Sequence, residues 1–558
     1  MTLSQRLALL CIIFLGFTLR SVGRNWDQNY HLHPDERFLT MVVSAMSWPK
    51  TISEYFDTSR SLLNPHNIGF GFYVYGTYPA IFVRYLSQLL HRADYSQLTL
   101  VGRAASAVID TGTIVLVFLI SSRLFKNTAL SLISALMYAL SVLPIQLSHF
   151  FAVDPYAVFF LTLSLYLLLI NSPLLGIAFG LTLAAKISSA LFLPVIALGL
   201  LINFFKPGQK INTIILGFIF VLTTAITLRV FYPYLFTGLQ FNPKVLQNWK
   251  ELDSLSGADS YFPPAVQWLH TRPVWYSLSN LLYWGLGLPL GLLSLISLPY
   301  VLVNHRRHGY VYLVILWVIG LFFYQSTQFA QPMRYLYPIY PFLAVTAGAV
   351  LFKILKISKI LLILVLALTL VWPLAFVSIY TRPHSRLAAS KWIYQNVPSG
   401  STLSCDHWDD CLPIGYPTEF RLLEYPLYGQ DTPEKWQDMS ARLAQTDYII
   451  MSSNRLFGSI SSAPDRYPAA SKFYADLFSG KLGFSPVVQF TSRPNLPIPG
   501  LNLCLTPPNI SYGAVSYQIQ NCPLPGLSFV DDYADETFTV YDHPKVIIFK
   551  KSSQHPKL

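Results

Sequence analysis

The segment His33-Pro34-Asp35-Glu36-Arg37 places two adjacent carboxylates beside a histidine and an arginine. A carboxylate can act as a general base that removes a proton from an acceptor hydroxyl, and a neighbouring acid can orient it. The same pattern also suits the start of a helix, because proline is favoured at the first helical position and acids in the first turn interact well with the helix dipole. Neither interpretation of Asp35 and Glu36 excludes the other.

Further polar groups lie at the ends of apolar segments. His149 and Asp154 flank one short connection, where Asp154-Pro155 could equally cap a helix. Lys186 and Arg334 each stand next to an apolar segment. Such cations either extend toward the membrane surface or bind an anionic group such as a lipid phosphate. We therefore treat these residues as candidates for substrate binding.

Arg103 and Asp110 lie inside one apolar segment, about two helical turns apart on roughly one face. Charges inside a membrane are candidates for function. Arg103 is the stronger candidate because it lies nearer the end of the segment, whereas Asp110 can be structural.

The composition assigns most of the chain to a lipid environment. Of the 558 residues, 53% are hydrophobic and only 12% are charged, against about 25% charged residues in an ordinary soluble protein. The net charge of +12 lies largely in short connections between apolar runs, where membrane topology explains it. We expect no nucleic-acid partner.

Apolar runs of sufficient length predict a polytopic α-helical membrane domain over residues 1–380, with about eleven spans. They cover approximately 4–23, 98–121, 128–149, 154–171, 173–185, 187–205, 211–231, 278–303, 310–327, 335–352 and 358–379.

Every second connection carries Lys or Arg without Asp or Glu, which is typical of the cytoplasmic side. These basic residues are Arg6, Arg123, Lys126, Lys206, Lys210, Arg306, Arg307, Lys353, Lys356 and Lys359. The pattern predicts a cytoplasmic N-terminus and external loops at 24–97 and 232–277. Residues 71–90 are expected to form a helix lying on the outer surface.

Residues 381–558 have the mixed texture of a soluble α/β domain outside the cytoplasm. We predict helices at 385–396 and 469–477, and strands at 447–451, 486–491 and 537–550. An even number of cysteines in this domain favours disulfides, locally Cys405–Cys411 and Cys504–Cys522. A zinc site is the competing interpretation, although the spacing matches no common zinc pattern.

Taken in order, several segments resemble the polyprenol-phosphate-dependent membrane glycosyltransferases of C-type fold, near the protein O-mannosyltransferases and the lipid A aminoarabinose transferases. They are Asp35-Glu36, Arg103-Ala104-Ala105-Ser106, Phe151-Ala152-Val153-Asp154, Gly180 to Lys186, Arg334-Tyr335-Leu336-Tyr337-Pro338-Ile339-Tyr340-Pro341, Lys391-Trp392-Ile393 through Pro398-Ser399-Gly400, and Trp408-Asp409-Asp410. The resemblance covers most of the chain.

The resemblance implies transfer of a sugar, such as a mannosyl, other hexosyl or pentosyl group, from polyprenyl phosphate to an acceptor outside the cytoplasm, with inversion. Asp35 would be the base, Glu36 its support and Asp154 a second acid. The substrate-binding candidates are His33, Arg84, Arg103, His149, Lys186, Arg334 and Tyr335, of which Lys186 and Arg334 would hold the phosphate.

The chain departs from the family pattern at Tyr78-Pro79-Ala80, where related transferases often carry Lys-Pro-Pro. Arg84 is a candidate replacement for that lysine. Some relatives in the wider fold use a divalent ion, and Asp35, Glu36 and Asp154 are residue types that could bind one. The chemistry itself requires no metal, because cations and a base suffice.

The resemblance places the protein in a bacterial plasma membrane, with membrane lipids around it and a protein, lipid or polysaccharide as acceptor. A transporter or flippase of a lipid-linked substrate is the main alternative, but no internal repeat supports it. A membrane scaffold without catalytic activity is a third hypothesis.

Overall fold

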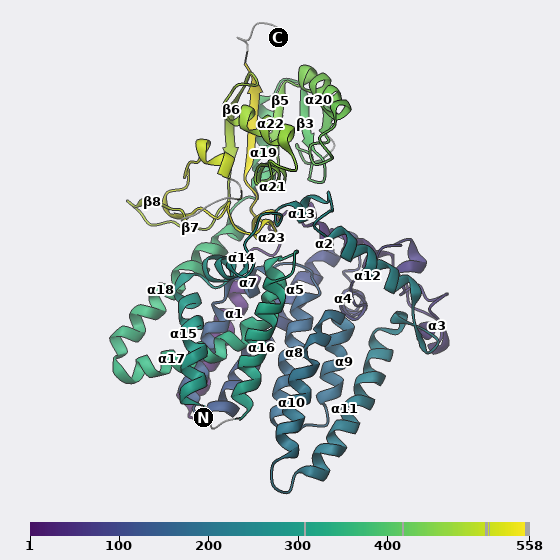
Figure 1. Ribbon diagram of the computed structural model, residues 1–558, viewed down its shortest axis with the longest axis vertical. Coiled ribbons are helices and arrows are strands. Elements are labelled where there is room, and N and C mark those ends of the chain that lie inside the picture. Colours follow the sequence, from purple (N-terminus) through teal and green to yellow (C-terminus); the bar gives the residue numbers. More distant parts are fainter. Residues whose placement is uncertain (306–308, 416–417, 508–511, 513, 553–558) are drawn as a thin grey trace.

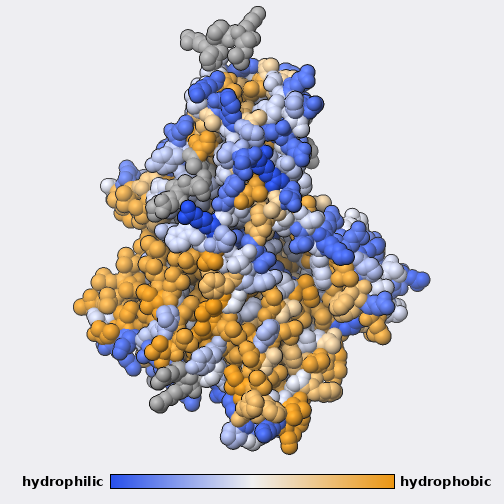
Figure 2. Space-filling view, viewed as in Figure 1, coloured by the Kyte–Doolittle hydropathy of each residue, from blue (hydrophilic) through white to orange (hydrophobic). Residues whose placement is uncertain are grey.

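The computed structural model describes residues 1–305, 309–415, 418–507, 512 and 514–552, and it has two parts (Figure 1). A body of helices contains the N-terminus, and a domain containing the main β-sheet stands on one end of this body. Apolar side chains cover the sides of the helical body, whereas polar side chains dominate the upper domain (Figure 2). The architecture is thus a polytopic helical membrane body with a C-terminal α/β domain.

Most of the predicted spans coincide with an apolar helix or with a pair of consecutive helices, whereas residues 278–303 are divided among three helical elements. Within the part of the chain that the structure describes, seven helices or consecutive helix pairs are long and apolar enough to cross a membrane by length and composition. They are formed by α1 (Leu3–Ser21), α5 (Tyr95–Phe125), η2 (Ile187–Phe192) with α10 (Leu193–Phe204), α11 (Lys210–Phe231), α16 (Gly309–Ser326), η5 (Met333–Ile339) with α17 (Tyr340–Ile357), and α18 (Lys359–Val377).

The other expected spans are bent or short in the structure. Helices α6 (Thr128–Ala139) and α7 (Val142–Ser148) form a pair bent by 57°. Helices α8 (Asp154–Leu169), α9 (Leu175–Ala185) and α15 (Leu288–Asn304) are apolar but shorter. The number of spans stays a prediction.

The segments predicted to be external lie at the end of the helical body that carries the upper domain (Figure 1). The turn between α10 and α11, with Lys206 and Lys210, lies at the opposite end. Arg306 and Arg307 fall outside the described residues. The elements of these predicted external segments are α2 (Pro34–Ala45), α3 (Ile52–Phe56), η1 (Pro65–Ile68), α4 (Tyr78–Leu89), η3 (Pro233–Leu235), β1 (Phe236–Thr237), β2 (Gln240–Phe241), α12 (Pro243–Leu255) and α13 (Pro263–Val266).

A buried ion pair fastens α1 to α5 inside the body. Arg20 donates to Asp110 at 2.5 Å, and both side chains are fully buried. The hydroxyls of Tyr138 and Tyr337 also donate to Asp110. Because charge and hydrogen bonds are satisfied within the protein, Asp110 is structural here.

The upper domain is built on a five-stranded sheet in the order β4 (Arg421–Tyr425), β3 (Thr402–Asp406), β5 (Tyr448–Met451), β10 (Val546–Lys551), β6 (Phe484–Phe490). Strand β3 pairs with β4 and β5 in parallel, and β10 is antiparallel to β5 and β6. A second sheet has the order β7 (Asn495–Leu496), β9 (Gly526–Phe529), β8 (Asn502–Leu505). The helices are α19 (Ser385–Asn396), α20 (Pro433–Gln445), α21 (Arg455–Ser461), α22 (Pro468–Phe478) and η7 (Ala514–Ile519).

The predicted strand at 537–550 is wrong in its first half. That part forms α23 (Glu536–Thr539), which Asp535 caps by accepting a hydrogen bond from the Thr537 amide, and then an irregular segment. Pro544 follows, and proline cannot donate a ladder hydrogen bond. The strand therefore begins only at Val546. The predicted helix at 385–396 is confirmed.

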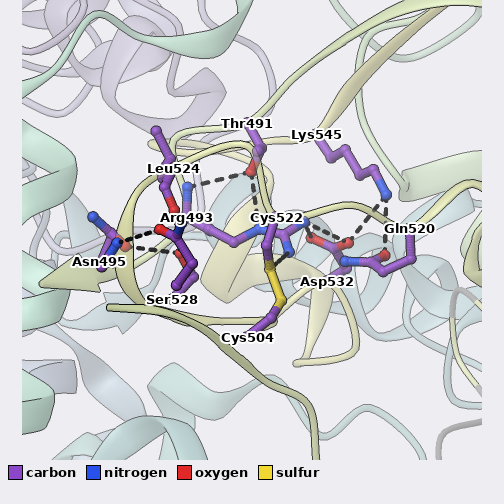
Figure 3. The surroundings of a disulfide bond; sticks show 12 residues. Thr491, Arg493, Asn495, Cys504, Gln520, Cys522, Leu524, Ser528, Asp532 and Lys545 are labelled. Carbon is purple, nitrogen blue, oxygen red and sulfur yellow. Dashed lines mark hydrogen bonds and ion pairs between the residues drawn. A yellow bond between two sulfur atoms is a disulfide. The ribbon is translucent and has the colours of Figure 1, made fainter. Parts of the chain in front are cut away.

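Both predicted disulfides are present, Cys405–Cys411 and Cys504–Cys522. Figure 3 shows the second beside Arg493, which contacts Cys522 and pairs with Asp532. Among the residues that the structure describes, no group of three or more His, Cys, Asp or Glu side chains could hold a metal ion. The disulfide interpretation of the cysteines is confirmed.

The irregular segment after α23 docks the upper domain onto the helical body. His543 lies between Asp531, at 2.8 Å, and Asp542, at 2.5 Å, and all three are buried. Asp542 also accepts hydrogen bonds from Tyr380 and Gln146, which belong to the helical body. Burial by itself would lower the pKa of His543, but the carboxylates of Asp542 and Asp531 raise it to about 10.

Two further contacts hold the parts together. Asp410 accepts from Arg37 on α2 at 2.9 Å and from Arg386 on α19 at 2.7 Å. Arg466 donates to the backbone carbonyls of residues 258–260 in the external loop. The remaining short helices, α14 (Trp275–Asn280), η4 (Leu281–Gly285) and η6 (Ser378–Thr381), lie close to this junction.

We predict that His543→Ala lowers the free energy of unfolding by about 3–5 kcal/mol, because it leaves two buried carboxylates without a cation. Thermal unfolding in detergent measures this. His270→Ala is the control, since His270 pairs with Asp465 at an exposed position and its loss should change little. The His543 contribution should be complete below about pH 6.5 and disappear as the pH rises through about 10. Equal unfolding temperatures for both variants would contradict this docking role.

Candidate active site

The acid pair begins helix α2, as its sequence suggested. His33 is the N-cap, and its Nδ1 accepts a hydrogen bond from the Glu36 amide at 3.4 Å. Burial lowers the pKa of His33 to about 4, so the ring is neutral and carries its proton on Nε2. Because successive helical residues point in different directions, Asp35 and Glu36 enter different environments.

Glu36 points into the protein. Its carboxylate accepts from Arg103 Nε at 2.8 Å and from a terminal nitrogen of Arg103 at 2.6 Å, and it also accepts from the Phe151 amide at 2.7 Å. Burial raises the pKa of Glu36, although Arg103 opposes this shift. Glu36 is therefore closed to solvent and holds α2 in place.

Arg103 has all its donor groups engaged within the protein. Besides Glu36 it donates to both oxygens of Asp27, at 3.0 and 2.9 Å, and to the backbone carbonyl of Arg24. Its guanidinium also lies 4.6 Å from the Trp26 ring centroid. The residue predicted to bind substrate is thus fully occupied by protein carboxylates, and its surroundings are those of a structural ion cluster.

Asp35 remains accessible and pairs with Arg334 at 2.5 Å. The two side chains are 31% and 27% exposed, whereas those of Glu36 and Arg103 are both at 0%. Burial would raise the pKa of Asp35, but the charge of Arg334 outweighs it and lowers the pKa. In this state Asp35 is charged and satisfied by one cation.

A second ion pair joins Lys186 to Asp154 at 2.7 Å, and its carboxylate is buried. The lysine side chain is 28% exposed, and its Nζ lies 5.0 Å from the centroid of the Tyr335 ring. Tyr335 directly follows Arg334 in η5. The structure therefore brings Lys186 and Tyr335 together, beside the Asp35–Arg334 pair.

Tyr75 is a buried tyrosine in the electrostatic field of both ion pairs. Burial raises the pKa of Tyr75 well above its usual value, and the negative charges of Asp35 and Asp154 raise it further. Its phenol thus lies within electrostatic reach of both carboxylates. It comes from the external loop between η1 and α4, and no motif around it had marked it in the sequence.

Tyr541 reaches the same site from the upper domain. Its ring stacks on His33 with the centroids 4.0 Å apart. Burial raises the pKa of Tyr541, and the charge of Asp35 raises it further. Because His33 lies two residues before Asp35, the stacking brings the Tyr541 ring close to the catalytic candidate. Sequence reasoning missed this residue because it lies about 500 positions away from Asp35, in a segment that was expected to be a strand.

Two predicted residues do not join the site through any contact. His149 is buried, stacks on Tyr380 at 3.6 Å and lies 2.9 Å from the Val22 carbonyl oxygen. Arg84 lies on α4 without an ion pair to any described residue, and its Nε is buried without a hydrogen-bond partner. Among the described residues, neither side chain contacts the Asp35–Arg334 pair or the Lys186–Asp154 pair.

The three acids considered as metal ligands do not fit a metal site. Glu36 binds Arg103, Asp35 binds Arg334 and Asp154 binds Lys186. A divalent cation needs several oxygen ligands that converge on one point. Each carboxylate here faces a different cation instead.

No protein-family model matches the sequence, and no curated protein matches it either. Among solved structures, the chain is similar to the archaeal oligosaccharyltransferase AglB from Archaeoglobus fulgidus in complex with an inhibitory peptide and a dolichol-phosphate. The identity is 13%, the match covers 85% of this chain and 72% of that chain, and the TM-score is 0.48.

The chain is also similar to ArnT from Cupriavidus metallidurans bound to undecaprenyl phosphate. Here the identity is 14%, 70% of this chain and 72% of that chain are covered, and the TM-score is 0.42. Both are similarities of the overall course of the chain at low sequence identity.

We predict that Arg103→Met destabilises the protein by about 3–5 kcal/mol, because it leaves Asp27 and Glu36 buried without their cation. Thermal unfolding measures the effect. Arg60→Met is the control, since Arg60 is exposed and its pair with Asp57 is weak. A variant as stable as the wild type that binds lipid phosphate less well would instead show that Arg103 contacts substrate.

Proposed function

We propose that the protein is an integral membrane glycosyltransferase of C-type fold, which transfers a sugar from a polyprenyl-phosphate donor to an acceptor on the non-cytoplasmic side. The observation that carries this proposal is the pair of accessible cations, Arg334 and Lys186, which are paired with Asp35 and Asp154. Asp35 lies on α2, at the end of the helical body that carries the upper domain (Figure 1). This position suits a lipid whose chain lies in the membrane and whose phosphate lies at its surface.

The two cations would bind the phosphate. A phosphate departs readily once its developing negative charge is stabilised by positioned cations. Arginine offers paired donors that match phosphate geometry, and lysine adds a mobile point charge. Asp154 keeps Lys186 in position before the donor arrives.

Asp35 would be the general base. A phosphate that binds Arg334 competes with Asp35 for the same guanidinium, and the loss of that partner raises the pKa of Asp35 toward its ordinary value. The carboxylate then accepts the acceptor's hydroxyl proton more readily. Donor binding would in this way prepare the base.

The proposed reaction is a single displacement at the anomeric carbon of the sugar. The acceptor oxygen loses its proton to Asp35 and forms a bond to the anomeric carbon. The bond from that carbon to the phosphate oxygen breaks, and its electron pair leaves with polyprenyl phosphate beside Arg334 and Lys186. Direct attack on the face opposite the leaving group inverts the anomeric configuration.

The function is tested by incubating the purified protein with radiolabelled polyprenyl-phosphate sugars and a membrane extract that supplies acceptors. Transfer of label, or slow hydrolysis of the donor without acceptor, is expected for at least one sugar. Neither reaction with any donor, at a protein concentration that binds polyprenyl phosphate, would overturn the proposal.

We predict that Asp35→Asn lowers the transfer rate by about 10²–10⁴-fold, the usual contribution of a general base. The same variant should bind polyprenyl phosphate more tightly than the wild type, because a neutral amide no longer competes with the phosphate for Arg334. Transfer assays and lipid-binding titrations measure the two effects. Asp57→Asn, at an exposed loop position, is the matched control and should change neither. Transfer at the wild-type rate by Asp35→Asn would exclude this residue as the base.

We predict that Lys186→Met and Arg334→Met each weaken binding of polyprenyl phosphate about tenfold or more, since each removes a charge-assisted hydrogen bond. Binding of the uncharged polyprenol should not change. Lys50→Met removes an exposed cation of the external loop and serves as the control. If both variants bound the phosphate like the wild type, the phosphate would have to lie elsewhere.

A further inference from the structure

Tyr541 is held rigidly although it lies in an irregular segment. His384 accepts a hydrogen bond from the Arg386 amide through Nδ1, so its neutral ring donates from Nε2 to the Tyr541 carbonyl at 3.1 Å. The following residue, Asp542, is fixed by Tyr380 and by His543. The backbone of Tyr541 is therefore anchored on both sides of the junction between the two parts.

The ring of Tyr541 is also fixed in orientation. It stacks on His33, two residues before Asp35, with an angle of 23° between the planes. The edge of Phe150 contacts it at 6.5 Å between centroids. Since the residue is only 8% exposed, its phenol is held in one direction and is not free to turn.

The hydroxyl of Tyr541 makes no hydrogen bond to any described residue. It is not among the hydroxyls that are fully enclosed without a partner, so a ligand or water can reach it. In contrast, the buried tyrosines Tyr138, Tyr337 and Tyr380 all donate to a carboxylate. The raised pKa of Tyr541 keeps its hydroxyl protonated, and hence a donor. The Tyr541 hydroxyl is therefore a hydrogen-bond donor that has no acceptor among the described residues.

A second unfilled donor lies in the same neighbourhood. Arg334 uses one terminal nitrogen for Asp35, but its Nε is buried without a hydrogen-bond partner among the described residues. The charges of Arg334 and Asp35 both act on the Tyr541 phenol. Two donors without acceptors, one of them cationic, suit a ligand with several anionic oxygens.

We propose that Tyr541 binds substrate, and that its hydroxyl donates a hydrogen bond to a phosphate oxygen of the polyprenyl-phosphate group held by Arg334. This inference rests on the proposed function. It makes the upper domain part of the donor site, because the phosphate is then bound by Arg334 from the helical body and by Tyr541 from the upper domain.

The test is the binding of polyprenyl phosphate and of polyprenol of the same chain length to the full-length Tyr541→Phe variant. Phenylalanine keeps the ring that stacks on His33 and removes only the hydroxyl. We expect binding of polyprenyl phosphate to weaken about tenfold and binding of polyprenol to stay the same. Tyr474→Phe is the control, because it removes a buried, unpartnered hydroxyl of the same domain far from any contact with Asp35. It should change neither affinity.

The outcomes separate the two proposals. If the wild type bound polyprenyl phosphate no better than polyprenol, the proposed function would fail. If the wild type preferred the phosphate and Tyr541→Phe kept the full preference, the role of Tyr541 would be refuted while the function stood. Equal losses for both ligands, as a disturbed fold would produce, would also contradict a specific contact with phosphate.

Discussion

The buried guanidinium of Arg103 is the interaction on which the candidate site depends. A charge removed from water must be neutralised and hydrogen-bonded within the protein, and Asp27 and Glu36 do this from the loop that follows α1. The cluster fastens the external loop to α5 and turns Glu36 inward. Because Asp35 is the adjacent helical residue, it is turned to a different side and remains accessible. The acid pair thus divides into one structural and one accessible carboxylate.

A second constraint is the docking of the upper domain. Three sets of contacts cross the junction: the hydrogen bonds of Asp542 with Tyr380 and Gln146, the Arg37–Asp410 pair, and the contacts of Arg466 with residues 258–260. Buried ion pairs contribute little net stability compared with apolar packing, but they are costly when mismatched. Here they set the relative position of the two parts, so that Tyr541 stacks on His33, two residues before Asp35.

The ion pairs of the helical body are of two kinds, enclosed and accessible. Arg103 and Arg20 are enclosed with their carboxylates and cannot exchange partners. Arg334 and Lys186 are themselves accessible, so a phosphate could reach them and replace their carboxylates. Physical accessibility, rather than the presence of a charge at a helix end, therefore separates binding candidates from structural residues. The sequence had made all three candidates for substrate binding, Arg103 as a charge inside an apolar segment and Lys186 and Arg334 as cations next to one.

The amino-acid sequence by itself determined the apolar helices, the α/β character of the C-terminal domain, both disulfides and the candidates Asp35, Asp154, Lys186 and Arg334. These follow from local signals: the length of apolar runs, the parity of cysteines and the placement of charges relative to helix ends. Only the tertiary structure decided which cation pairs with which acid, that Glu36 and Arg103 are closed to solvent, and that Tyr75 and Tyr541 complete the site. Those contacts join residues hundreds of positions apart, and burial depends on everything packed around a side chain, so no local pattern encodes them.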